Sequence, residues 1–262
     1  MALPRITSRL FPKGSLRGIR NAFPSVTATI QPFSLFPARK QAGATRKTEP
    51  LVGLVKARRT IYQLGKKSPV PDSKIEELVN SAILNVPSAF NTQSTRLLAL
   101  LHSVHEHLWD VVIHVFQNLV KPGAIPEQVW QTQTLPKLQG FKAGVGTILF
   151  YEDPAHIKPF SEKFAPYKDQ FQPWADHSNA MHQYFLWTGL ESLGFGANLQ
   201  YYNPLIDAPV VKLWDIPGEW RLVAQLVFGS PEGPPGEKSQ KPIEERVKIY
   251  GKQEEDTSTS TG

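Results

Sequence analysis

The distribution of charge divides this chain of 262 residues before any folding pattern is considered. Residues 1–48 carry nine basic side chains and no acidic one, whereas the remaining 214 residues hold 20 basic and 23 acidic side chains. The net charge of +6 therefore comes from the first segment. A folded domain is expected over 49–252, and the polar stretch 253–262 is expected to be a disordered tail. Because a nucleic-acid-binding domain keeps its positive charge in the folded part, nucleic-acid binding is not expected.

Residues 1–48 have the composition of a mitochondrial transit peptide. Leu3, Ile6 and Leu10 fall on one side of a short helix, and Arg5 and Arg9 fall on the other. A cationic, amphipathic segment of this kind suits import into mitochondria. We therefore expect a mitochondrial matrix protein. The alternative is a basic tail without a targeting role, and hence a cytoplasmic protein.

Several classes of site are ruled out by residues or motifs that the chain lacks. It has no cysteine, which excludes disulfides, thiolate nucleophiles and cysteine-based metal or iron–sulfur sites. No apolar run approaches the roughly 18 residues of a membrane helix, so no transmembrane segment is expected. Neither a G-x-G-x-x-G turn after a strand nor a Walker loop is present, so a Rossmann domain is not expected.

Two polar clusters suggest chemistry but fit it poorly. Four histidines lie between 102 and 114, without the i, i+4 pair and carboxylate of a zinc helix, and are expected to face solvent. The consecutive Asp-His-Ser at 176–178 cannot readily form a triad, so Ser178 is expected to cap a helix. No metal and no hydrolytic triad are therefore predicted. The histidines are His102, His105, His107 and His114.

Helical and strand-like patterns alternate along the folded part. Apolar residues at helical spacing alternate with near-continuous apolar runs typical of buried strands. A capping box of Ser73 and Glu76 is expected to begin the second helix. The pattern predicts one α+β domain with helices around a small sheet of about four strands. Helices are expected at 51–62, 73–86, 108–121, 127–139, 178–193 and 205–214, strands at 95–101, 145–151, 197–201 and 221–228, and an extended arm at 229–242.

Two basic segments are candidates for binding an anion. Arg58, Arg59 and Thr60 place two guanidinium groups beside a hydroxyl, which suits a phosphate. Lys238 and Lys241 add cations on the arm after the last strand. Each segment alone also fits a solvated basic surface or linker.

Two further segments could contact a flat ligand. The loop 87–93 gathers hydroxyl and amide side chains that can hydrogen-bond the rim of a heterocycle. In the segment 194–201, small residues allow close approach of backbone to a ring, and larger polar residues follow at its edge. An ordinary turn and a helix cap are the alternatives. The residues are Pro87, Ser88, Asn91 and Gln93 in the first segment, and Gly196, Ala197, Gln200 and Tyr201 in the second.

Taken in order, the four segments resemble the nitroreductase-like family of FMN flavoproteins, most closely its fungal branch of nitroreductase-like, fatty-acid-response oxidoreductases. The resemblance spans about residues 50–250. It is carried by the Pro-Ser-Ala-Phe-Asn-Thr-Gln-Ser run at 87–94 and by Gly-Ala-Asn-Leu-Gln-Tyr-Tyr-Asn-Pro-Leu-Ile at 196–206. Trp-Asp-Ile-Pro at 214–217 and Leu-Val-Phe-Gly at 226–229 extend it.

The resemblance implies an intertwined homodimer with a small, mostly antiparallel sheet surrounded by helices and FMN at its interface. It implies an enzyme that takes hydride from NADH or NADPH through flavin N5 and reduces nitroaromatic or quinone-type acceptors by a ping-pong mechanism. No catalytic side chain is obligatory, because the flavin does the chemistry. One alternative is a flavin-binding regulator of stress or lipid signalling with little turnover. Another is a mitochondrial structural protein without flavin.

The resemblance also implies a role for each candidate residue. Trp174 belongs to an aromatic series in 160–174 that either packs into the core or the partner or forms a wall over the flavin. Two departures stand out, since many bacterial relatives have Pro-Trp where Ser94 and Thr95 stand here, and often Arg in place of Lys241. The implied cofactor-binding residues are Arg58, Arg59, Thr60, Pro87, Ser88, Asn91, Gln93, Gly196, Ala197, Lys238 and Lys241, and the substrate-binding residues are Trp174, Gln200 and Tyr201.

Overall fold

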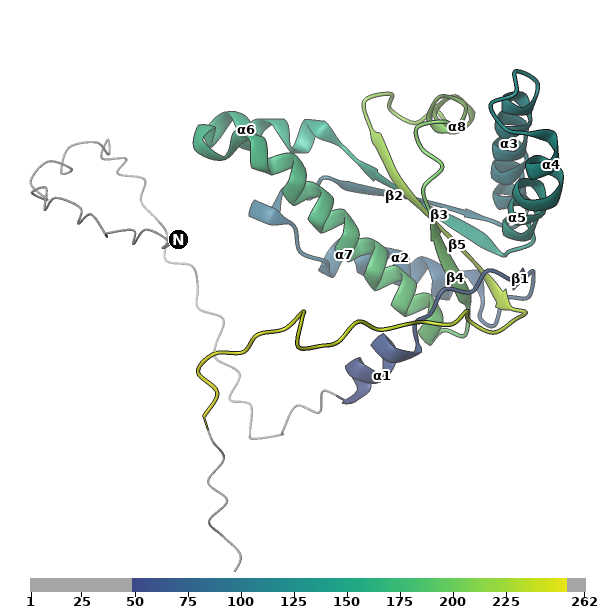
Figure 1. Ribbon diagram of the computed structural model, residues 1–262. Helices are drawn as coiled ribbons and strands as arrows, with labels where there is room; N and C mark the ends of the chain where they lie inside the picture. The colour runs from purple at the N-terminus through teal and green to yellow at the C-terminus, as the bar shows by residue number, and fades with distance from the viewer. Residues whose placement is uncertain (1–48, 254–262) are drawn as a thin grey trace, which may run out of the picture. The chain divides into compact units, whose positions relative to one another are not determined.

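The computed structural model describes residues 49–253, so the predicted transit segment and nearly all of the predicted tail lie outside the described residues. Five strands form a sheet in the order β1-β5-β3-β2, and β4 also pairs with β5 (Figure 1). All these strand pairs are antiparallel, which confirms the predicted sheet. The strands are β1 (Leu64–Gly65), β2 (Thr95–Leu101), β3 (Gly146–Glu152), β4 (Gly196–Gln200) and β5 (Arg221–Pro231).

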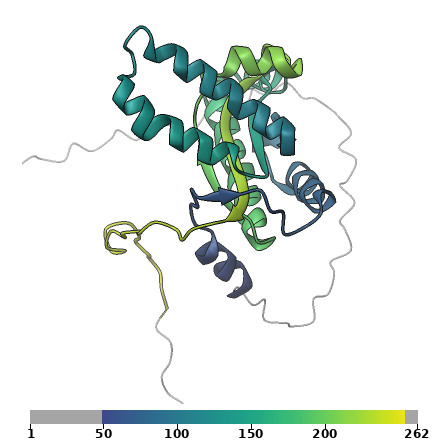
Figure 2. The same ribbon diagram turned by 90° about the vertical axis from the view of Figure 1, so that its right-hand side faces the viewer.

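Helices cover both faces of this sheet (Figures 1 and 2). One face carries α2 (Asp72–Asn85) and α7 (Phe171–Ser192), and the other carries α3 (His102–Val120), α5 (Leu135–Lys142) and α8 (Asp207–Trp214). The remaining α-helices are α1 (Glu49–Ala57), α4 (Glu127–Val129) and α6 (Lys158–Lys163). Between α4 and α5 one turn of π-helix runs over Trp130–Thr134, and 3₁₀ turns occur at Ala89–Asn91, Pro154–His156 and Ala165–Gln170.

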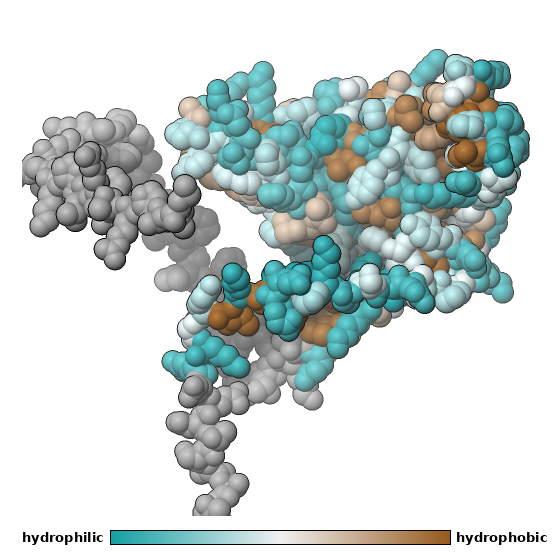
Figure 3. Space-filling model, in the orientation of Figure 1, coloured by the Kyte–Doolittle hydropathy of each residue, from teal (hydrophilic) through white to brown (hydrophobic). Residues whose placement is uncertain are grey.

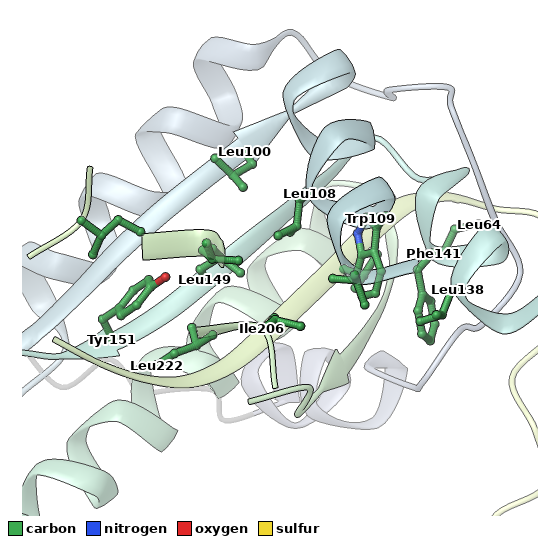
Figure 4. Packing of buried hydrophobic residues seen from close by; sticks show 14 of the residues in the cluster. Leu64, Leu100, Leu108, Trp109, Leu138, Phe141, Leu149, Tyr151, Ile206 and Leu222 are labelled. Atoms are coloured by element: carbon green, nitrogen blue, oxygen red, sulfur yellow. The ribbon is translucent and has the colours of Figure 1, made fainter. Parts of the chain in front are cut away.

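Strand β3 explains why the core strands read as unbroken apolar runs. All its residues are buried. Ile148 and Phe150 pack into the cluster under α2 and α7, whereas Leu149 and Tyr151 pack into the cluster under α3, α5 and α8 (Figure 4). Successive side chains of a strand point to opposite faces of the sheet, and helices cover both faces here. The sequence of the strand therefore shows no alternation of apolar and polar residues.

The predicted first helix ends too late. Helix α1 stops at Ala57, and the chain after it runs beside β4, where Thr60 forms a parallel bridge with Ala197. The Ile61 N–H donates to the carbonyl oxygen of Ala197, and the Asn198 side chain donates to the Ile61 carbonyl oxygen. These hydrogen bonds hold residues 60 and 61 against β4. Strand β1 was not predicted, since two residues are too few to show a pattern.

Both predicted helix caps are wrong. Pro71 precedes α2 without a side-chain cap, so Ser73 lies inside the helix. Helix α7 begins at Phe171, well before Ser178. The buried Ser178 hydroxyl instead donates to the carbonyl oxygen of Trp174, one turn earlier.

The predicted solvated face is wrong for His105, which is fully buried. Helix α3 already begins at His102, so His105 faces the sheet together with Leu108 and Trp109. Its Nδ1 lies 2.8 Å from Thr147 Oγ1 and its Nε2 lies 3.1 Å from the carbonyl oxygen of Phe141. Burial lowers the pKa of His105 to about 4. The other three histidines of this group are exposed.

Residues 49–253 contain neither a metal-binding cluster nor a membrane-spanning helix. This part of the chain holds no group of three or more histidine, aspartate and glutamate side chains arranged for a metal ion. It also contains no helix that is long and apolar enough to cross a membrane.

Candidate functional site

A cationic hollow of about 390 Å³ lies where the chain leaves α1. Arg58, Arg59 and Thr60 line one side of it, and Lys238 reaches it from the arm that follows β5. The Arg59 guanidinium donates to the carbonyl oxygen of Gly236 and so ties the arm to this wall. Three cations and a hydroxyl thus converge from two distant segments. Tyr62, Gly236 and Glu237 complete the lining.

Arg58 occupies the inner wall of this hollow. Its guanidinium carbon lies 4.4 Å from the centroid of the Trp187 ring and 6.0 Å from that of Tyr184. Its Nε is buried and has no hydrogen-bond partner among the described residues. A buried guanidinium donor without an acceptor, beside two further cations, fits the phosphate of a mononucleotide.

Glu191 places one acid near the two arginines. Its Oε2 accepts from the Arg59 backbone N–H at 3.5 Å. Burial raises the pKa of this carboxyl, and the N–H and the positive charges of Arg58 and Arg59 oppose the rise. The arginines are therefore only partly neutralised within the protein.

The predicted polar loop is strained. Phe90, Asn91 and Gln93 have φ of 54°, 56° and 50°, in the left-handed region that costs a non-glycine residue about 1 kcal/mol or more. The loop is closed from within, because Ser88 Oγ accepts from the Gln93 N–H at 3.0 Å. The side chains of Asn91 and Gln93 are exposed, as is Pro87. Strain retained in a loop with free amide groups is typical of a binding site.

Phe90, in the middle of this loop, packs against the predicted aromatic series. Its ring centroid lies 5.1 Å from Phe164, 5.3 Å from Phe171 and 5.8 Å from Trp174, with Trp174 nearly parallel to it. Phe171 is buried, whereas Phe90 is half exposed. The aromatic series therefore packs partly against the polar loop, and only Phe171 of it is buried, so the predicted packing into the core or the partner stays a prediction for the series as a whole. Its second predicted role, as a wall over the flavin, stays a prediction.

The segment 196–201 is divided between core and surface. Gly196 and Ala197 are buried in β4, and a Cβ atom on Gly196 would lie only 3.0 Å from Ile61. The missing side chain of Gly196 therefore makes room for Ile61. Gln200 is buried and donates to the Asn198 side chain. Tyr201 is 63% exposed and lies free beyond the end of β4. A ligand contact of these residues remains a prediction.

One chain does not bring all the predicted site residues together. Arg58 lies over Trp187, and the polar loop lies against Trp174, thirteen residues earlier on α7. At 1.5 Å per residue these two points on the helix are about 20 Å apart. Lys241 does not line the cationic hollow. The predicted phosphate-binding residues and the polar loop thus lie toward opposite ends of α7, whereas Ala197 of the second ring-contact segment lies beside Thr60.

An apolar groove of about 670 Å³ lies beside the cationic hollow, between α1, α2 and α7. Leu51, Leu54, Met181 and Tyr184 line it, and each is at least 40% exposed. The arm follows β5 and runs over 232–253, since the first three residues of the predicted range 229–242 belong to β5. It leaves further apolar side chains open, and Figure 3 shows hydrophobic residues at the surface of the strip in which Figure 1 draws the arm. The exposed apolar residues of the arm are Ile243, Val247, Ile249 and Tyr250.

Sequence reasoning missed part of this site. Trp187 and Tyr184 show only the spacing of an ordinary helix, and their stacking with Arg58 depends on tertiary structure. Phe90 stood inside the recognised loop motif, but its place at the centre of the aromatic cluster had no sequence signal.

Comparisons with known proteins agree with the fold. Residues 55–230 match the model of the nitroreductase family. HBN1 of Saccharomyces cerevisiae is 31% identical over 199 residues, which cover 74% of this chain and 93% of HBN1. The nitroreductase CinD of Lactococcus lactis, solved with chloramphenicol, is 40% identical with a TM-score of 0.68, and the match covers 76% of this chain and 98% of CinD. A nitroreductase-type protein of Desulfovibrio desulfuricans, solved with FMN, shares the fold at 17% identity and a TM-score of 0.52, over 76% of this chain and 95% of that one.

Proposed function

The chain belongs to the nitroreductase family, and from this membership we propose that it is an FMN-dependent oxidoreductase. It would use NADH or NADPH to reduce flat, electron-poor acceptors such as nitroaromatics and quinones. The observation that carries the proposal is the cationic hollow, in which Arg58, Arg59, Thr60 and Lys238 offer donors to one phosphate. The FMN of the Desulfovibrio protein and the nitro compound chloramphenicol of CinD support the cofactor and the acceptor class.

When bound, FMN would supply the redox chemistry by accepting a hydride from the nicotinamide and passing it on to the acceptor. The protein then has to bind, orient and shield. Arg58 and Lys238 would hold the phosphate, while Ser88, Asn91 and Gln93 would hydrogen-bond the rim of the ring. The aromatic cluster around Phe90 would keep water from one side of the ring. No acid or base from this chain is required, in keeping with the poor fit of residues 176–178 to a triad.

We further propose that two copies of the chain form the site. The predicted phosphate residues and the polar loop lie about 20 Å apart along α7 within one copy, so a second copy would have to supply one of the two. The exposed groove beside α1 and the apolar side chains of the arm offer the surface that such a dimer would bury. The proposed assembly is a homodimer with its cofactors at the interface.

The experiment compares FMN with riboflavin, which has the same ring but no phosphate. The full chain is stripped of flavin, and the binding of each compound is measured by the quenching of its fluorescence. If the cationic hollow holds the phosphate, FMN should bind at least about 30-fold more tightly than riboflavin. The Arg58→Ala variant should reduce this preference strongly. Equal binding of both flavins to the unaltered chain would contradict the proposed phosphate site.

Localisation is a separate proposal. We propose the mitochondrial matrix, because residues 1–48 are cationic and amphipathic. A fluorescent protein fused behind residues 1–48 should enter mitochondria, and the same fusion with Arg5 and Arg9 changed to glutamate should not. A diffuse cytoplasmic signal from the unaltered fusion would contradict this proposal.

A further inference from the structure

Glu152, at the end of β3, is a buried carboxylate that the proposed function does not yet use. It is 1% exposed. Within residues 49–253, no lysine, arginine or histidine nitrogen lies within 4.0 Å of it. Burying a carboxylate without a cation is costly unless several hydrogen bonds compensate. An apolar residue at the end of this mostly apolar strand would avoid that cost. The presence of a carboxylate there therefore needs an explanation.

Three neutral donors surround the carboxylate. Ser94 Oγ donates to Oε2 at 2.6 Å, and Thr95 Oγ1 donates to Oε1 at 2.7 Å. The Asn179 side chain of α7 also donates to Oε1, at 2.8 Å. All three residues are buried. Because an ionised carboxylate only accepts, these donors satisfy it without a counter-ion.

Two of these donors directly follow the strained polar loop. The loop ends at Gln93, whose φ of 50° is left-handed, and the next two residues both point their hydroxyls at Glu152. Backbone hydrogen bonds reinforce the attachment, since the Asp153 N–H donates to the carbonyl oxygen of Ser94 at 2.9 Å.

The neighbouring acid fixes the same loop end through a second path. Asp153 forms an ion pair with Arg96 at 2.9 Å, and the Arg96 guanidinium donates to the carbonyl oxygen of Gln93 at 2.7 Å. Two consecutive acidic residues, Glu152 and Asp153, therefore hold residues 93–96 in place at the end of β3. Strained backbone persists only where its surroundings fix it on several sides, and this double attachment supplies that constraint.

We infer that Glu152 is a positioning residue, which holds Ser94 and Thr95 and thereby keeps the loop 88–93 in the strained conformation that meets the flavin ring. The inference rests on the proposed function, because it assigns the loop to the ring. Glu152 acts through the loop and not through the phosphate-binding residues. Disturbing the anchor should therefore weaken binding of FMN and riboflavin by the same factor.

The test uses Thr95→Val, which keeps the shape of the side chain and removes one hydrogen bond to Glu152. Thr147→Val is the matched control, since Thr147 is a buried threonine at the other end of β3 whose Oγ1 accepts from Trp109 Nε1 at 3.0 Å. Two further variants test the same contact. Ser94→Ala removes the other hydroxyl donor, and Glu152→Gln replaces the carboxylate itself. We would measure the melting temperature of each full-length variant and its Kd for FMN and for riboflavin. Hydrogen exchange of the backbone amides at 91–93 is followed in the protein without flavin.

Thr95→Val should weaken the binding of both flavins about tenfold and speed exchange at 91–93. Thr147→Val should lower the melting temperature and leave both flavin Kd values and that exchange unchanged. The inference is overturned if Thr147→Val weakens flavin binding as much as Thr95→Val, or if Thr95→Val and Ser94→Ala leave Kd and exchange unchanged. An unaltered chain that binds neither flavin would overturn the proposed function itself, and with it the role of Glu152.

Discussion

The guanidinium carbon of Arg58 lies over the Trp187 ring, 4.4 Å from its centroid, while the adjacent Arg59 donates to the carbonyl oxygen of Gly236 on the arm. Two consecutive arginines are thus held by different parts of the protein. Arg58 keeps a buried Nε without a partner among residues 49–253, whereas Arg59 already spends a donor on the arm. This difference predicts unequal roles in binding the phosphate.

Arg58→Ala should lose far more FMN affinity than Arg59→Ala. Removing a charge-assisted hydrogen bond to a buried anion costs about 2–4 kcal/mol, which is roughly 30- to 1000-fold in Kd. Arg59→Ala should retain most of the affinity, because part of its guanidinium serves the arm. Flavin content of the purified variants and titration with FMN measure the ranking. If Arg59→Ala loses more flavin than Arg58→Ala, this assignment is wrong.

Removing the arm should cost both dimerisation and flavin. Strand β5 continues to Pro231, so a chain ending there keeps the sheet intact and loses Lys238 together with the exposed apolar residues of the arm. The shortened protein should run as a monomer in sizing chromatography and bind FMN weakly. A shortened protein that remains dimeric and yellow would show that the arm serves neither purpose.

Stability should fall as pH drops below the ordinary pKa of histidine. The pKa of His105 is about 4 in the folded protein and about 6.5 in the unfolded chain, so the unfolded state takes up the proton first. The contribution is fully present above about pH 6.5 and is lost as pH falls toward 4. Between about pH 7 and about pH 5 it should remove about 2 kcal/mol from the free energy of unfolding.

Urea unfolding of His105→Gln measures this contribution. The variant should be less stable near neutral pH and should lose less stability on acidification, with the remaining slope coming in part from His182, whose pKa burial also lowers. His107→Gln, at an exposed histidine of the same helix that has no ion pair among residues 49–253, is the control and should keep the full slope. An unchanged slope in His105→Gln would exclude His105 as its source.

The aromatic cluster should affect the acceptor more than the nicotinamide. Trp174→Ala removes the ring that lies nearly parallel to Phe90, and Tyr201→Ala removes an exposed ring beyond β4. Each substitution should raise the KM for a quinone acceptor several-fold. The rate of flavin reduction by NAD(P)H, measured anaerobically as a separate half-reaction, should change less. Steady-state rates should give parallel double-reciprocal lines, because both substrates use one open face in turn. Intersecting lines would require both substrates to be bound together.

Long apolar runs were predictable, and their boundaries were less so. Strand β2 occupies its predicted residues and β3 and β5 begin within one residue of theirs, because buried strands leave an unbroken apolar pattern. Helix α7 starts seven residues before the predicted Ser178, with Pro173 in its first turn, where a missing N–H costs no hydrogen bond. Helix α1 stops early because residues 60 and 61 pair with β4 instead, and no local pattern in the sequence reveals that pairing.

The candidate site was also predictable only in part. Its segments stood out in the sequence because each gathers unusual residues within a few positions. The way in which they meet could not be predicted, because it depends on the path of the whole chain. Examples are the contact of Arg58 with Trp187 and the place of Lys238 in the cationic hollow. Glu152 was missed for the same reason. It reads as the polar end of an apolar strand, and its importance follows from where Ser94 and Thr95 lie.

Anaerobic titration of the FMN-loaded protein decides whether this chain exchanges hydride with a nicotinamide and an acceptor. NADH or NADPH is added first and a quinone or nitroaromatic second, while the visible flavin absorbance is followed. An oxidoreductase should bleach at about one nicotinamide per flavin and regain its colour rapidly with the acceptor. A flavin-binding regulator would hold a flavin whose colour no acceptor restores faster than oxygen does. A protein that stays colourless after reconstitution with FMN, or whose flavin neither nicotinamide bleaches, is not an FMN-dependent oxidoreductase.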